Sequence, residues 1–224
     1  MSEQNSTGGT TVVARSPIAP PDPHLRDGWE VSARVSTAAL TLSDETPLAK
    51  VTVRAPFGGA TDTALGTGFG RTARIDTPTG TVLVVGSGPG EWLVLGAPGT
   101  GDALRDHLEE TLASSGEFVT VLDLTHGRAL VRIRGRSAAA MLAKVCGIDL
   151  SEQVTPDGAA LRTSVAKVVT DVVRDDRGGE VSYLLHCERS SGRYLCEALL
   201  DAGAEFGIEV TGFDAMTVRQ EVAR

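Results

Sequence analysis

The sequence predicts an α+β fold of repeated β-β-α units, in which antiparallel sheets carry helices on one face. Three features of the sequence lead to this prediction. Apolar and polar residues alternate in several short segments, which is typical of half-buried strands. Turn residues separate these segments in pairs. Leucine and alanine then recur at spacings of three and four residues, which indicates that an amphipathic helix follows each pair.

The clearest unit spans residues 119–150. Alternation on both sides of Thr125-His126-Gly127 predicts a hairpin of two paired strands. Gly135 ends the second strand, and Ser137 stands where a helix N-cap belongs. An apolar stripe follows it at helical spacing and consists of Ala138, Met141, Leu142 and Val145. We expect this helix to pack on the hairpin.

A second unit begins at residue 81. Residues 81–85 and 91–95 are predicted to pair across the glycine-rich turn 86–90. Residues 102–114 then place leucines at i, i+4 and i+8 and charged residues on the other faces, which predicts a helix. A strand is also predicted over 48–53. The glycine-rich stretch 66–80 is expected to be a loop region.

A third unit covers the end of the chain. Strands are predicted over 165–173 and 181–187, joined by a turn at 175–179. A helix over about 191–206 and a short strand at 208–210 complete it. The alternation fixes which side chains share a face, and it leaves the order of the strands open.

The chain is expected to comprise a flexible N-terminal arm (1–46), an α+β body (47–214) and a C-terminal tail (215–224). The first 14 residues are rich in Ser, Thr and Gly, and prolines crowd the following positions. The arm nevertheless contains apolar side chains without periodicity. We expect these to be partly ordered on a partner: Ile18, Leu25, Trp29, Val31, Val35, Leu40 and Leu42.

Composition limits the classes of function. The chain has 224 residues and a net charge of −8, which opposes a nucleic-acid backbone. No apolar run approaches the length of a membrane span, and no basic, then apolar leader starts the sequence, so a cytoplasmic location is expected. Three widely spaced cysteines, Cys146, Cys187 and Cys196, indicate reduced buried thiols and no disulfide framework.

Two glycine-rich loops are candidate phosphate sites. Gly86–Gly90 joins strand to strand and lacks a following Lys-Ser/Thr, so a turn is the preferred interpretation. Gly96–Asp102 does precede a helix. Asp102 occupies the expected cap position and would repel a phosphate, which favours a capped helix entry.

The remaining candidates also have structural interpretations that we prefer. Asp123 and His126 could form an acid–base pair, but they flank a turn, where both residue types are common. His186-Cys187 with Cys196 could ligate a metal, but neighbouring strand residues point to opposite faces. Trp92 is interpreted as a core or interface anchor. The sequence therefore predicts no catalytic, cofactor-binding or metal-ligating residue on this chain.

A family resemblance accompanies these patterns. The run from Leu122-Asp123-Leu124 through Gly135, Leu142-Ala143-Lys144, Cys146 and Ile148-Asp149-Leu150 resembles the gamma subunit of heterotetrameric sarcosine oxidase, whose fold is related to the folate-binding aminomethyltransferases. Further matches are Arg15-Ser16-Pro17, Gly88-Pro89-Gly90-Glu91-Trp92-Leu93, Arg189-Ser190, Tyr194-Leu195 and Leu199-Leu200-Asp201-Ala202. Val145 departs from the glycine usual there, and Gly90 departs from an acidic residue. The Lys-Gly-Cys-Tyr signature of folate-dependent iron–sulfur assembly proteins is replaced by Lys144-Val145-Cys146-Gly147.

The resemblance implies a non-catalytic structural subunit of a flavin-dependent complex that oxidises sarcosine to glycine, hydrogen peroxide and formaldehyde or its folate adduct. It implies alpha, beta and delta subunits as partners, with FAD, FMN, NAD and tetrahydrofolate held by them. No nucleic-acid or membrane partner is implied. Two alternatives stay open: a free-standing folate-binding protein or aminomethyltransferase-like enzyme, which needs a carboxylate for the pterin ring, and an orphan adaptor with the same fold.

Overall fold

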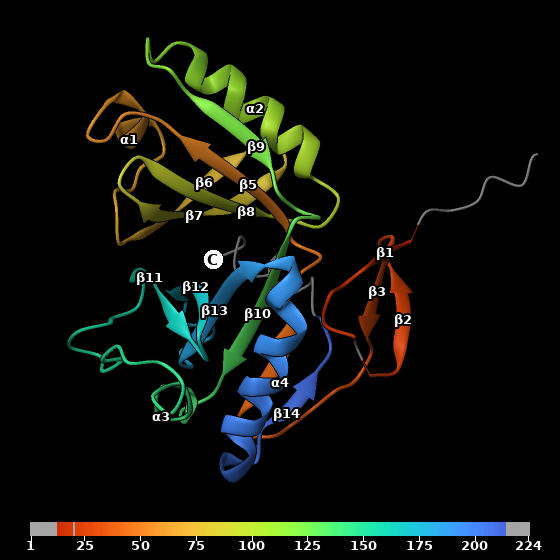
Figure 1. Cartoon of the computed structure of the whole chain (residues 1–224). Helices are drawn as coiled ribbons and strands as arrows, with labels where there is room; N and C mark the ends of the chain where they lie inside the picture. The colour runs from red at the N-terminus through yellow and green to blue at the C-terminus, as the bar shows by residue number, and fades with distance from the viewer. Residues whose placement is uncertain (1–12, 20, 214–224) are drawn as a thin grey trace, which may run out of the picture.

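The computed structural model describes residues 13–213 except residue 20. The predicted tail, 215–224, and the start of the predicted arm, 1–12, lie outside the described residues. Two large sheets dominate the described part (Figure 1). The first has five strands, all antiparallel, in the order β6-β7-β8-β5-β9. Their bounds are β5 Ala49–Arg54, β6 Thr72–Thr77, β7 Gly80–Gly88, β8 Glu91–Gly96 and β9 Thr120–Asp123.

The second sheet has six strands in the order β11-β12-β13-β10-β4-β14. Its neighbouring strands are antiparallel except β14 and β4, which run parallel. Their bounds are β4 Thr41–Asp44, β10 Arg128–Arg134, β11 Ala160–Val165, β12 Val168–Arg174, β13 Ser182–Glu188 and β14 Glu209–Thr211. A small third sheet comprises β1 Ala14–Arg15, β2 Pro23–Arg26 and β3 Trp29–Ser32.

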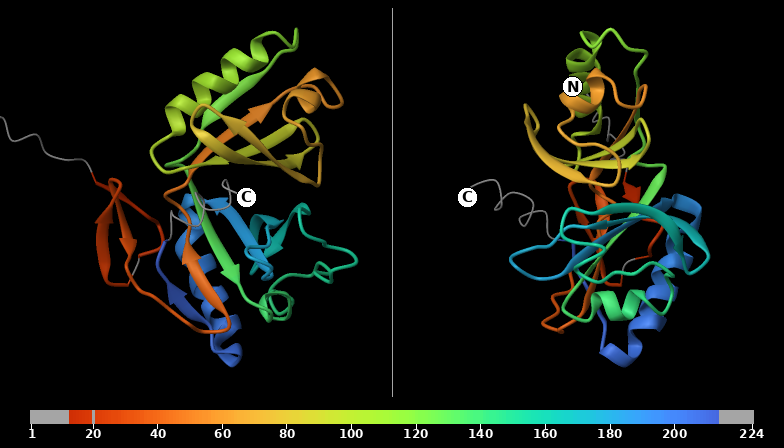
Figure 2. Two further views of the ribbon diagram at one scale, coloured as in Figure 1. Left: turned by 180° about the vertical axis from the view of Figure 1, so that it is seen from behind. Right: turned by 90° about the vertical axis from the view of Figure 1, so that its left-hand side faces the viewer.

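The two large sheets face each other and carry their helices on the outside. The apolar stripe of α2 (Gly101–Ala113) packs on the five-stranded sheet together with Leu65, which follows α1 (Ala60–Ala64). The helices α3 (Ala138–Leu142) and α4 (Gly192–Gly203) cover the six-stranded sheet (Figures 1 and 2). Short 3₁₀ turns flank α4 at Arg189–Ser191 and Ala204–Phe206. Each sheet thus has helices on one face, which confirms the predicted α+β class.

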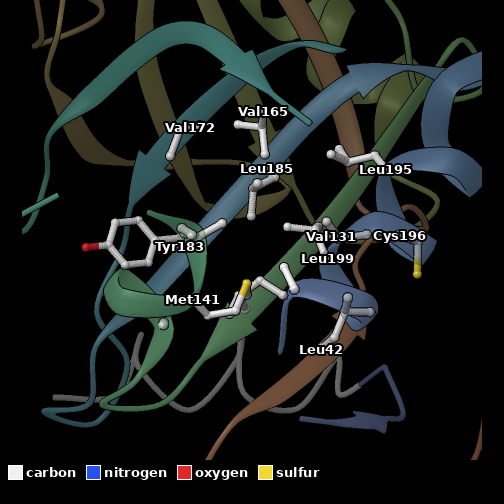
Figure 3. Packing of buried hydrophobic residues seen from close by; sticks show 14 of the residues in the cluster. Leu42, Val131, Met141, Val165, Val172, Tyr183, Leu185, Leu195, Cys196 and Leu199 are labelled. Carbon is white, nitrogen blue, oxygen red and sulfur yellow. The ribbon is translucent and has the colours of Figure 1, made fainter. Parts of the chain in front are cut away.

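The apolar core on the outer face of the six-stranded sheet is formed by alternate strand residues and by the apolar stripes of the helices. Val131 and Leu185 project from β10 and β13 towards Leu195 and Leu199 of α4, and Met141 of α3 closes the same cluster (Figure 3). Every second strand residue supplies this cluster, because alternate strand side chains point to opposite faces.

Among the described residues, no helix is long and apolar enough to cross a membrane.

Several predicted elements are confirmed. The strands β7 and β8 pair across a turn at Pro89–Gly90, with a bulge between Gly86 and Gly88. The strands β12 and β13 pair as the predicted hairpin, and α2, α4, β5 and β14 lie within a few residues of their expected bounds. These segments have regular periodicity and clear turn residues, so local pattern suffices to place them.

The predicted hairpin over 119–134 is wrong. Both strands exist, but β9 pairs with β5 in one sheet, and β10 pairs with β13 and β4 in the other. The turn Thr125-His126-Gly127 is therefore a crossover between sheets. Alternation shows that a segment is a strand with one buried face, and it carries no information about which strand lies next to it.

Two further expectations need correction. The stretch 66–80, expected to be a loop region, contains β6, which pairs with β7 along six residues. The strand predicted over 165–173 begins three residues later, at Val168, because Ala166 and Lys167 adopt positive φ and form the turn that follows β11, a strand that the sequence analysis did not predict. Neither residue is glycine, so the usual sequence signal for such a turn is missing.

The predicted boundary between a flexible arm and a body at residue 47 is also wrong for the described residues. Leu40 and Leu42 are buried in the core beneath α4, and β4 is an interior strand of the six-stranded sheet. Trp29 and Val31 are buried in the cluster between the two large sheets. Residues 29–44 thus belong to the body of this chain. Their apolar side chains show no period because they contact several different elements.

Candidate functional site

The layer between the two large sheets is polar at both ends and apolar in the middle. On β13 the inward-facing residues are His186, Leu184 and Ser182, and on β12 they are Val169, Asp171 and Val173. Leu184 and Val173 belong to the apolar cluster that joins the sheets. The polar residues on either side of this cluster line two separate cavities, and these are the candidate sites.

The first, which we term the histidine cavity, has a volume of about 390 Å³ and lies between β5, β8 and β9 on one side and β10, β12 and β13 on the other. This volume is within the range of small-molecule sites in proteins. Besides His186 and the charged residues described next, its walls include Thr52, Leu93, Leu122, Leu124 and Val169.

A continuous chain of hydrogen bonds and ion pairs crosses the histidine cavity from one sheet to the other. His186 Nδ1 lies 3.1 Å from Asp171 Oδ2, and Arg162 Nε donates to Asp171 Oδ1 at 2.6 Å. Arg162 Nη2 donates to Glu91 Oε1 at 2.5 Å, and Arg54 Nη2 lies 3.0 Å from Glu91 Oε2. Each carboxylate is thus already neutralised by an arginine of this chain.

Burial determines the state of His186. It lowers the pKa of the imidazole, and the hydrogen bond with Asp171 opposes this without cancelling it, so the ring is neutral at pH 7. Burial alone would raise the pKa of Asp171, but the hydrogen bonds with His186 and Arg162 outweigh it and lower that pKa. With Nδ1–H donating to Asp171, Nε2 is left as an acceptor. This atom is buried and has no partner among the described residues. It cannot take a proton from a molecule in the cavity without movement of the ring.

The second, which we term the arginine cavity, has a volume of about 350 Å³ and is lined by Arg132, Arg177 and Glu45, among others. Arg132 Nη2 donates to Asp175 Oδ2 at 2.9 Å, and Arg177 Nε donates to the same oxygen at 3.1 Å. Burial alone would raise the pKa of Asp175, yet the guanidinium groups of Arg132, Arg177 and Arg74 lower it to about 2. Glu45 Oε1 accepts from Ser43 and lies 3.6 Å from Arg132 Nε.

A third buried charge sits where the chain crosses between the sheets. Lys50 is 0% exposed, and its Nζ donates to the carbonyls of Thr46 and Leu48 at 2.6 Å each. Its backbone pairs with the other crossover through Thr125 Oγ1 and the N–H of Leu124. Burial lowers the pKa of the ammonium to about 7. Because Nζ ties down carbonyls of the β4–β5 crossover, we interpret Lys50 as structural.

The structure does not join Asp123 and His126 as an acid–base pair. Asp123 Oδ1 accepts from the backbone N–H of Thr125 at 2.7 Å, as a turn residue does. The exposed His126 ring stacks on Trp29, with ring centroids 5.0 Å apart and planes 6° apart. Both residues serve the crossover, in line with the preferred interpretation.

The three cysteines are also separated. His186 faces the layer between the sheets, whereas Cys187 packs in the outer core with Cys196 of α4, as the alternation predicts. Burial raises the pKa of Cys187 to about 11 and that of Cys196 to about 12, so both are protonated thiols at pH 7. No group of three metal-ligating side chains lies together anywhere in residues 13–19 or 21–213.

The glycine-rich loops have conformational roles. Gly90 has a φ of +67°, and a Cβ there would lie 2.2 Å from the carbonyl oxygen of Ala55, so the hairpin turn excludes larger residues. At the entry to α2 the N-cap residue is Thr100 and the predicted cap, Asp102, is wrong. Asp102 lies in the first turn and pairs with Arg105.

Residues that carry the family resemblance meet in the structure. Trp92 is buried, and its indole N–H donates to a backbone carbonyl 2.8 Å away, which confirms it as a core anchor. Pro17 packs against Gly192, where a Cβ would lie 3.0 Å from the proline ring. Arg189 donates to the backbone carbonyl of Arg15. The Arg-Ser-Pro segment is therefore held on the start of α4.

Comparison with known proteins places this fold. Residues 80–223 match the GCVT N-terminal domain family. This chain belongs to the GCVT N-terminal domain family. Dimethylglycine dehydrogenase of Homo sapiens is 28% identical over 155 residues, which cover 66% of this chain and 18% of that protein. An aminomethyltransferase of Geobacillus thermodenitrificans is 34% identical over 97 residues, which cover 43% of this chain and 26% of that protein. The GCVT-family chain thus spans only a fifth to a quarter of the length of these relatives.

Two solved structures resemble the GCVT-family chain closely in fold. A chain of heterotetrameric sarcosine oxidase from Corynebacterium sp. U-96 gives a TM-score of 0.63 at 26% identity, covering 78% of this chain and 89% of that one. The glycine cleavage system aminomethyltransferase T of Bartonella henselae gives 0.65 at 18% identity, covering 89% of this chain and 57% of that one. The second similarity concerns the fold alone.

The sequence analysis missed both cavities of this GCVT-family domain. Asp171 and His186 are 15 residues apart, and only the register of β12 against β13 brings them opposite each other. One signal was available: each lies two residues from a buried apolar residue of the same inward face, Val173 for Asp171 and Leu184 for His186. A polar residue at such a position requires a partner on a neighbouring strand.

Proposed function

We propose that this chain is a structural, gamma-type subunit of a cytoplasmic, flavin-dependent sarcosine oxidase complex, which oxidises sarcosine to glycine, hydrogen peroxide and formaldehyde or its folate adduct. One observation carries the proposal. The chain aligns with 89% of a chain of a heterotetrameric sarcosine oxidase at 26% identity, and with only 57% of an aminomethyltransferase chain at 18%. The similarity therefore extends over nearly the whole of one subunit of a multi-subunit oxidase.

The geometry of the two cavities supports a role without chemistry on this chain. The carboxylates Asp171, Glu91 and Asp175 are each bound by arginine, and the free nitrogen of His186 is buried. A general base needs an accessible atom within hydrogen-bond reach of the substrate. We assign FAD, FMN, NAD and tetrahydrofolate to partner subunits, for which alpha, beta and delta subunits are the candidates.

Co-expression tests this function. The tagged chain is produced together with candidate alpha, beta and delta subunits, and the material that copurifies is analysed for composition, sarcosine oxidation and flavin absorbance. We expect a four-component complex that oxidises sarcosine and an isolated chain that is colourless and inactive. Absence of the other subunits from the purified material, or stoichiometric flavin on the isolated chain, would contradict the proposal.

A folate-binding function is the second candidate, and one observation favours it. Glu45, a buried carboxylate, lines the arginine cavity and offers the acidic group that a pterin ring requires. Its contacts with Ser43 and Arg132 compete with this use. Titration of the isolated chain with tetrahydrofolate, followed by tryptophan fluorescence, distinguishes the two functions. Saturable binding that is lost in Glu45→Gln would favour the folate-binding protein.

A further inference from the structure

Exposed apolar side chains border the histidine cavity on both sides. Leu122 of β9 is 50% exposed, and Val169 of β12 is 71% exposed, and both lie on the cavity wall. The strand β9 is the outermost strand of its sheet, so this border is reachable from outside. Large apolar groups gathered beside a cavity are typical of interaction surfaces.

The charges in the cavity walls determine what chemistry the site accepts. Its six charged side chains form ion pairs with one another: Arg54 with Glu91, Arg162 with Glu91 and Asp171, and Arg128 with Glu188. Three positive and three negative charges cancel, and His186 is neutral. A phosphate, a carboxylate or a metal cation would have to compete with an existing ion pair, so the site is complementary to an uncharged occupant.

The position of the apolar residues identifies the kind of occupant. The exposed side chains of Leu122 and Val169 lie on the cavity wall and reach partly outside the cavity. A small molecule held within the cavity would leave them in water. A polypeptide segment can enter the cavity with one side chain and cover the border with its neighbours.

We propose that the histidine cavity is the docking site for an uncharged, apolar segment of a partner subunit, with Leu122 and Val169 as the contacts on its two sides. This inference rests on the proposed function, because it names the surface by which the chain joins the complex. The ion pairs across the floor hold the two sheets at a fixed separation, and the segment fills the space that remains between them.

The test uses the full chain co-expressed with the candidate subunits. Leu122→Asp, Val169→Asp and the double variant place a charge at the border, and Val154→Asp is the matched control. Val154 is 60% exposed in the loop between α3 and β11 and lies on neither cavity wall. We expect the double variant to reduce the recovered partner at least tenfold, and the control to recover as much as the wild type. Circular dichroism and thermal unfolding check that each variant is folded.

Hydrogen exchange of the complex gives a second measurement. Slower exchange in β9 and β12 on assembly supports the docking site. Undiminished recovery by the double variant, with unchanged exchange in both strands, overturns the site and leaves the proposed function standing. Self-association that depends on Leu122 identifies a second copy of this chain as the occupant and also overturns the proposal. If the wild-type chain recovers no partner, the proposed function itself fails.

Discussion

Replacing Asp175 by asparagine would remove the central acid of the buried arginine network. The carboxylate is 2% exposed and accepts from Arg132, Arg177 and Arg74. Asparagine keeps the shape of the side chain and removes its charge. Arg132 would then be buried with Glu45, 3.6 Å away, as its nearest remaining acid. Loss of one partner from a buried ion pair costs about 3–5 kcal/mol, and Glu45 places the expected loss near the lower value, about 3 kcal/mol at pH 7.

The same residue gives a pH dependence whose sign is fixed. The pKa of Asp175 is about 2 in the folded chain against an ordinary value of 3.8. A difference of nearly two units corresponds to about 2.5 kcal/mol. Because the folded-state pKa is the lower one, this stabilisation is present above about pH 4 and is lost as the pH falls towards 2. In the asparagine variant this contribution is absent at every pH.

Urea unfolding of both proteins at several pH values between 7 and 2.5 measures the two effects. We expect the difference in free energy of unfolding to be about 3 kcal/mol at pH 7 and to shrink by about 2 kcal/mol at the acid end. Glu197→Gln removes an exposed pair with Arg193 and serves as the control, with no measurable cost expected because solvent screens this pair. The reasoning would be refuted if Asp175→Asn lowered the free energy of unfolding by less than about 1 kcal/mol at pH 7, or if the difference between the two proteins did not change with pH.

Three further predictions follow from the described contacts. In the wild type, the pKa of Lys50 in the folded chain is lowered to about 7, so the free energy of unfolding should rise with pH between about 7 and 10.5. Lys50→Met should abolish this rise, and unfolding measurements at pH 7 and pH 10 test it. Deletion of residues 1–46 should abolish cooperative thermal unfolding, because it removes β4 and the buried Leu42; a truncated chain with a sharp transition would contradict this. Cys187→Ser and Cys196→Ser should each lower the free energy of unfolding in urea by about 1–3 kcal/mol, and elemental analysis should show no loss of bound metal.

Local pattern predicted much of this fold, and strand pairing explains most of what it missed. The leucine stripe of α2 and the turn at Pro89–Gly90 each depend on residues that are close together in the sequence, so the sequence alone predicts them. The assignment of β9 and β10 to different sheets depends on contacts with β5 and β13, which are distant in the sequence. Periodicity fixes the buried face of a strand and leaves its neighbour undetermined.

The candidate site was hidden for a related reason. Arg162 and Asp171 face each other by the register of β11 and β12, whereas Glu91 comes from the opposite sheet. No spacing in the sequence reports a contact between sheets. The segment before residue 47 was misjudged because residues such as Trp29 and Leu40 pack on different clusters and so show no period. An aperiodic apolar segment can belong to the core of its own chain.

The most direct test of the account is native mass spectrometry of the chain purified alone and after co-expression with the alpha, beta and delta candidates. The account predicts that the chain alone has its sequence mass of 23.3 kDa, with no flavin or folate attached. It predicts that the co-expressed material contains one copy of this chain in a four-subunit assembly that carries all of the cofactors. An isolated chain that carries flavin or folate, or a co-expressed sample in which the larger subunits assemble without it, would contradict the structural role proposed here.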